Sequence, residues 1–104
     1  VPRDGFSYFV LRRIFMETRV ALIAIIVHCE DSVGELNGLL HEYGKYIIGR
    51  MGIPYRERGV NIISVAVDAP QDMINSLSGK IGNISGITVK TAYSDVVSGK
   101  GSGD

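Results

Sequence analysis

The strongest pattern in the chain is an unbroken apolar run at residues 20–27, Val-Ala-Leu-Ile-Ala-Ile-Ile-Val. It is rich in β-branched residues and has no polar position, which is typical of a strand in the middle of a sheet with both faces covered. Crossing a bilayer as a helix takes about 20 residues, so the run is too short for that. It predicts a central strand with one face against helices of this chain and the other against another subunit.

A helical apolar stripe follows, beginning one residue after Ser32 and ending just before Gly44. Ser32 and Glu35 form a capping-box pattern, in which the two side chains satisfy free backbone N–H groups at a helix start. Glycine is typical just beyond a helix end. We therefore predict an amphipathic helix from Ser32 to Gly44, whose apolar residues are Val33, Leu36, Leu39, Leu40 and Tyr43.

A second helical segment starts at Pro70, where a first turn tolerates the missing N–H of proline. Ile74, Leu77 and Ile81 continue on one face, and Gly82 follows. The spacing predicts a second amphipathic helix over residues 70–82 on the same sheet face as the first.

Three further segments predict strands. Residues 46–53 and 59–67 are joined by the short polar stretch 54–58, as in a hairpin, and residues 87–93 alternate with period two. The order of elements is then βαββαβ. This is the split βαβ arrangement, so the predicted fold class is α+β, ferredoxin-like, with an antiparallel sheet and two helices on one face.

The chain has 104 residues, 45% of them hydrophobic, which fits one domain with a buried core. Eleven basic residues balance eleven acidic ones. A net charge of zero gives no general attraction for nucleic acid or an anionic membrane and little repulsion between copies. We expect a homo-oligomer, a dimer or tetramer, that binds neither nucleic acid nor membrane.

The two ends differ in composition from the middle. Residues 1–15 precede Met16 and start with Val-Pro-Arg, so they read as an expression-tag remnant or as a natural apolar extension. Residues 16–97 are predicted to form the domain, and residues 98–104 a flexible tail. Without a secretory signal pattern, and with Cys29 as the single cysteine, we expect a cytoplasmic location.

The residues with the most reactive side chains are His28, Cys29 and His41. Neighbours on an extended strand point to opposite faces, so His28 and Cys29 cannot readily share one metal ion. The sequence shows no general base near Cys29, and no residue to orient such a base, at a spacing typical of nucleophilic catalysis. We expect no catalytic residue, no metal and no cofactor, and hence no enzyme. A metal sensor built from these three side chains across subunits stays open as a less favoured alternative.

The segment at residues 31–36, Asp-Ser-Val-Gly-Glu-Leu, resembles the Asp-x-Pro-Gly-x-Leu start of ACT domains, with valine in place of the usual proline. In that family this turn and the helix start commonly hold amino acids or other small effectors. Backbone N–H groups at a helix start readily receive a carboxylate. The resemblance implies a ligand site at Asp31, Ser32, Val33, Gly34 and Leu36.

A longer stretch, residues 16–93, is similar to the iron-only hydrogenase system regulators, small ACT-like proteins related to the C-terminal domain of nickel-responsive repressors. The likeness is carried by residues 17–23, 41–56, 62–70 and 77–82. It implies a ferredoxin-like, ACT-like fold, association through sheets or helices, and a regulatory role linked to hydrogenase genes. The repressors carry His and Cys ligands around their middle strands, whereas residues 46–67 contain neither. Nickel binding by that route is therefore not expected, and fifteen leading residues leave no room for a DNA-binding domain.

Two classes of function follow. The preferred hypothesis is an effector-sensing regulatory module with its pocket at the 31–36 turn. The alternative is a pure protein-assembly module without a small-molecule ligand, which the two-faced apolar strand and the absence of a strong ligand signature favour.

Overall fold

The computed structural model describes residues 17–97 and confirms the βαββαβ order. Short 3₁₀ turns, η1 (Glu30–Ser32), η2 (Gly44–Tyr46) and η3 (Arg56–Arg58), join some of the elements. The predictions made for residues 1–15 and 98–104 lie outside the described residues. The strands and helices are β1 (Arg19–Val27), α2 (Val33–Glu42), β2 (Ile47–Tyr55), β3 (Val60–Ala69), α3 (Gln71–Gly82) and β4 (Ile87–Val97).

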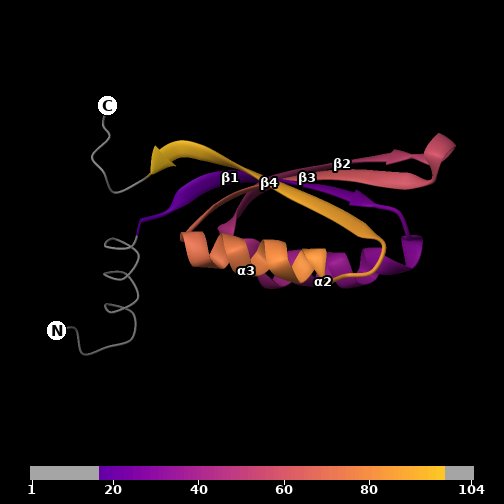
Figure 1. Ribbon diagram of the computed structural model, residues 1–104, viewed down its shortest axis with the longest axis horizontal. Helices are drawn as coiled ribbons and strands as arrows, with labels where there is room; N and C mark the ends of the chain where they lie inside the picture. Colours follow the sequence, from indigo (N-terminus) through magenta and orange to yellow (C-terminus); the bar gives the residue numbers. More distant parts are fainter. Residues whose placement is uncertain (1–16, 98–104) are drawn as a thin grey trace.

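The four strands form one antiparallel sheet in the order β2-β3-β1-β4. β1 lies between β3 and β4, which confirms the prediction of a central strand. Figure 1 shows α2 and α3 side by side below the sheet. This is the predicted α+β, ferredoxin-like architecture, with both helices on one face.

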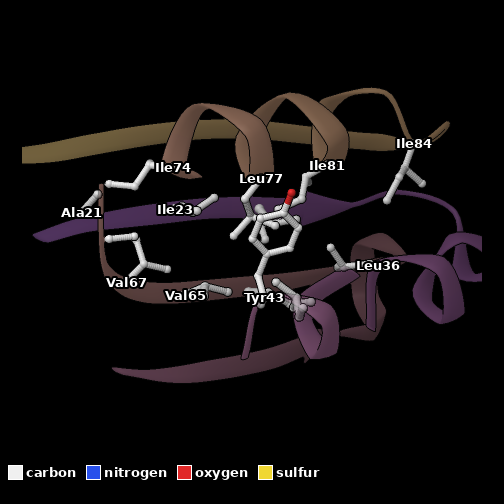
Figure 2. Close-up of a cluster of buried hydrophobic side chains, with 14 of the residues drawn as sticks. Ala21, Ile23, Leu36, Tyr43, Val65, Val67, Ile74, Leu77, Ile81 and Ile84 are labelled. Atoms are coloured by element: carbon white, nitrogen blue, oxygen red, sulfur yellow. The ribbon is translucent and has the colours of Figure 1, made fainter. Parts of the chain in front are cut away.

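The core lies between the sheet and the two helices. Every second residue of β1 and β3 points into it, because successive side chains of a strand alternate between faces. Figure 2 shows Leu36 and Tyr43 directed toward the side chains of α3 and the two central strands. The buried apolar residues of these elements are Ala21, Ile23, Ile25, Val27, Leu36, Leu40, Tyr43, Ile63, Val65, Val67, Ala69, Ile74, Leu77 and Ile81.

No described element covers the opposite face of the sheet (Figure 1). Residues directly opposite each other in antiparallel strands share a face, so the strand register defines its members. We call it the open face. It consists of Val20, Leu22, Ala24 and Ile26 of β1, Val60, Ile62, Ser64, Ala66 and Asp68 of β3, Gly49, Met51, Ile53 and Tyr55 of β2, and Thr88, Lys90 and Ala92 of β4.

The β2–β3 hairpin is longer than predicted. β2 runs through Pro54 to Tyr55, and the turn is the 3₁₀ segment η3 followed by Gly59. Proline is tolerated in β2 because this is an edge strand with a neighbour on one side only. The whole hairpin tip is exposed.

One detail predicted for the first helix is wrong. Ser32 is the N-terminal flanking residue of α2, but its side chain makes no capping hydrogen bond to the helix. At the other end, the helix stops at Glu42, just before Gly44, as predicted, and Gly44 begins the turn η2. The extent of the helix was thus predicted well and the role of Ser32 was not.

Within residues 17–97, no helix is both long enough and apolar enough to cross a membrane.

Candidate functional site

The predicted ligand residues lie at the turn between β1 and α2, at one end of the sheet. Asp31 is exposed in η1, Val33 is half-buried, and Gly34 is exposed in the first turn of α2. Ser32 and Leu36 are buried. The turn therefore offers Asp31, Gly34 and the edge of Val33 to a ligand, whereas the other two face the interior.

Ser32 connects this turn to the loop between α3 and β4. Its hydroxyl donates a hydrogen bond to the backbone carbonyl of Ser85. Beside it, the backbone N–H of His28 donates to the carbonyl of Gly86 at 2.7 Å. These two bonds hold the β1–α2 turn against the loop. The first of them engages the Ser32 hydroxyl and so explains why Ser32 does not cap α2.

Gly86 makes the closest contact in this region. Its φ is +77°, and a Cβ built on it would lie 2.6 Å from the Cβ of Cys29. Both the backbone conformation and the proximity of Cys29 therefore require glycine here. Sequence reasoning missed this residue, although Ser85-Gly86 between a helix and a strand is an ordinary turn signal.

The electrostatics of the turn are mixed. Glu30, Asp31 and Glu35 are exposed carboxylates within the first turns of η1 and α2. The start of a helix carries partial positive charge from backbone N–H groups. The turn can therefore bind a zwitterionic ligand, whose negative group would face the helix start and whose positive group would face the carboxylates.

The three candidate metal ligands do not converge. The Nε2 atom of His28 lies 2.9 Å from the hydroxyl of Thr88, Cys29 packs beside Gly86, and His41 is exposed on α2. Residues 17–97 contain no cluster of three or more His, Cys, Asp or Glu side chains that could hold a metal ion.

A second polar cluster lies between the two helices. The hydroxyl of Tyr43 is 3.0 Å from that of Ser76, and the Lys80 ammonium is 5.2 Å from the centre of the Tyr43 ring. Interaction with Lys80, and then with the Ser76 hydroxyl, lowers the pKa of Tyr43 below its usual 10.0. The same interaction raises the pKa of Lys80. The helical stripe predicted Tyr43 as a core residue but not this polar contact.

Comparison with known proteins identifies relatives. Residues 19–91 match the family model described as "TM1266-like: Iron-only hydrogenase system regulator, putative". Among solved structures, the chain is similar to the uncharacterized protein TM1266 from Thermotoga maritima, with 38% sequence identity and a TM-score of 0.71. That match covers 73% of this chain and 96% of the other. No curated protein matches. The chain thus belongs to the TM1266-like family, as the sequence resemblance implied.

Proposed function

We propose that the protein is a non-catalytic regulatory module that binds a small zwitterionic effector, of the free amino acid class, at the β1–α2 turn. The observation that carries the proposal is the position of Ser32. Because its hydroxyl is committed to Ser85, no side chain caps α2, and the exposed Asp31 and Gly34 lie beside that helix start. An effector carboxylate would approach the α2 start and its ammonium would approach Asp31.

The family supports the regulatory part of the proposal, since its description is that of a regulator of an iron-only hydrogenase system. We propose the same setting for this chain. The module would act as a homo-oligomer, with the turn as its effector pocket and the subunit interface as the part that transmits effector binding.

Thermal unfolding with a panel of free amino acids, nucleotides and divalent metals, at fixed protein concentration, tests the effector. A ligand at 100 times its Kd stabilises a single site by about 2.7 kcal/mol, which raises the Tm of a domain this small by about 10 °C or more. We expect such a shift from at least one amino acid. Asp31→Ala and Gly34→Ala should abolish it.

Gly38→Ala is the matched control. Gly34 and Gly38 both lie in α2, and an added Cβ meets nothing within 4 Å at either position. Only the first borders the proposed site, so the control should keep the shift. Loss of the shift in all three variants would contradict binding at the turn.

A pure assembly module is the second candidate, and the uncovered apolar sheet face favours it. An oligomer whose Tm responds to nothing in the panel would support it. A response to metals alone, lost on alanine substitution of His28, Cys29 or His41, would instead support a metal sensor.

A further inference from the structure

The open face carries most of the large apolar side chains that are exposed on the described part of the molecule. Its large apolar side chains are 37% to 65% exposed, and they belong to three adjacent strands. Isolated exposed apolar residues are ordinary, but a contiguous patch across a sheet marks an interaction site. These large side chains are Val20, Leu22, Ile26, Met51, Ile53, Tyr55 and Ile62.

The face is large enough for a stable interface. Four strands spaced about 4.8 Å apart, with nine residues of about 3.3 Å each, give a projected area of about 570 Å². Two such faces in contact would bury about 1,100 Å², above the roughly 1,000 Å² that separates specific interfaces from chance contacts.

The arrangement of large and small side chains on the open face favours packing against another β-sheet. The register places Ile26, Ile62 and Ile53 in one row across the strands. The next row has small residues at its centre, Ala24 opposite Ser64. Bulky rows beside shallow rows allow the side chains of two packed sheets to interdigitate.

The charges on the face favour a second copy of the same chain. The register assigns it one basic residue, Lys90 opposite Ala24, and one acidic residue, Asp68 opposite Val20. The face is therefore neutral, and two copies in a twofold arrangement do not repel each other. A strongly charged partner would find no complementary field here.

We infer that the open face is an interface at which a second copy of this chain packs its own open face, sheet against sheet. The inference rests on the homo-oligomer of the proposed function and names the surface that forms it. Leu22 and Ile26 of β1 occupy its middle, because β1 is a central strand, and β2 supplies Met51 and Ile53 at one border.

Light scattering coupled to gel filtration tests the interface directly. The wild-type chain should have the mass of at least two copies. Leu22→Lys and, separately, Ile53→Lys should reduce the number of copies by half or more, since each places a charge within an apolar contact. Both side chains are about half exposed in the single chain, so the lysine can extend into water and the monomer should fold.

Gly38→Lys is the matched control, because it adds the same charge on the helix side, where an added Cβ meets nothing within 4 Å. It should leave the mass unchanged. Circular dichroism verifies folding of each variant. A monomeric wild type would overturn the inference, as would folded Leu22→Lys and Ile53→Lys variants with unchanged mass.

Methionine oxidation gives a second readout on the unmodified chain. Met51 is 65% exposed in the single chain, so peroxide should oxidise it slowly in the assembled wild type and rapidly in the Ile53→Lys variant. Met73, partly buried against the core, serves as the internal reference. Equal Met51 rates in the two proteins would count against the sheet interface.

The two proposals fail separately. If the wild type is a monomer whose Tm responds to an amino acid through Asp31 and Gly34, the effector proposal stands and the interface proposal fails. If the wild type is an oligomer that Leu22→Lys disrupts but its Tm does not respond to the panel, the interface proposal stands and the effector proposal fails.

Discussion

Two glycines in the described chain, Gly59 and Gly86, have positive φ values, yet their surroundings differ. At Gly59 an added Cβ would meet nothing within 4 Å, whereas at Gly86 it would overlap the Cβ of Cys29. At Gly59 only the backbone conformation favours glycine. At Gly86 both the backbone conformation and the lack of space for a side chain require it, because there the α3–β4 loop lies against the β1–α2 turn.

Alanine at these two positions should separate the two effects. Gly59→Ala should destabilise the protein by about 1 kcal/mol, the cost of a left-handed alanine. Gly86→Ala should cost about 1–3 kcal/mol more, because backbone or Cys29 must also move. Urea unfolding of both variants measures the difference, and equal losses would show that the Cys29 contact carries no restriction.

Tyr43 provides a prediction on pH. Because its pKa in the folded protein is below the unfolded value, its ionisation stabilises the fold above the unfolded pKa, and this contribution disappears as pH falls through the folded pKa. Lys80 has the opposite sign, and its contribution is complete below its unfolded pKa and is lost as pH rises through the folded one.

Ultraviolet absorbance reports tyrosine ionisation, and subtracting the titration of Tyr43→Phe isolates Tyr43. We expect its midpoint below pH 10, with an upward move in Lys80→Met, which keeps the side-chain length without the charge. A midpoint at or above 10 in the wild type, or one that Lys80→Met leaves in place, would contradict the assigned interaction.

Among the elements, α2 links the core to the candidate site. Its start carries the exposed Asp31–Gly34 edge, and its inner stripe includes Leu36, which is fully buried. The resemblance to ACT domains implied a ligand role for Leu36. The structure places this side chain in the core, below the turn.

Truncation of the stripe should therefore affect stability according to burial. Leu36→Ala should cost roughly 2–5 kcal/mol of unfolding free energy. Leu39→Ala, the same change in the same helix at a half-buried position, should cost clearly less. Chemical denaturation of both variants provides the comparison, and similar costs would mean that Leu36 is not the anchor of α2.

The element order could be predicted from the sequence because the two helical segments repeat at helical spacing, while the strand segments are short apolar or alternating runs. The hairpin was predicted too short, since Pro54 ordinarily ends a strand and only the edge position of β2 permits it. The role of Ser32 could not be predicted, because its partner Ser85 is 53 residues away and capping is the local alternative. For Gly86 the local turn signal was available, but the contact with Cys29 comes from a residue distant in sequence and could not be predicted.

At the scale of the whole molecule, one layer of helices covers a sheet that is apolar on both faces. The sequence predicted this from the run at residues 20–27, which has no polar alternation. Burial of one face is visible in the single chain, whereas a second molecule is our proposal for what covers the other face. This is why the fold could be predicted from one sequence and the assembly remains a proposal.

An assembly held together by the open face makes thermal stability depend on concentration. The wild-type Tm should rise as protein concentration is raised, because association favours the folded state. The Tm of Leu22→Lys should be lower and nearly constant over the same range. Differential scanning calorimetry at several concentrations measures both, and a constant wild-type Tm would argue for a folded monomer.

The register of β1 with β4 has a practical consequence for protein engineering. Arg19 pairs with Val97, so the first and last residues of the sheet are neighbours at the end opposite the β1–α2 turn. A linker of a few residues can join them, and a circularly permuted chain can open instead at the exposed tip Arg56–Gly59. Because the two ends are adjacent, the domain can also be inserted into a surface loop of a reporter enzyme. Both junctions with the enzyme would then lie at one end of the sheet, and the β1–α2 turn at the other end would stay accessible.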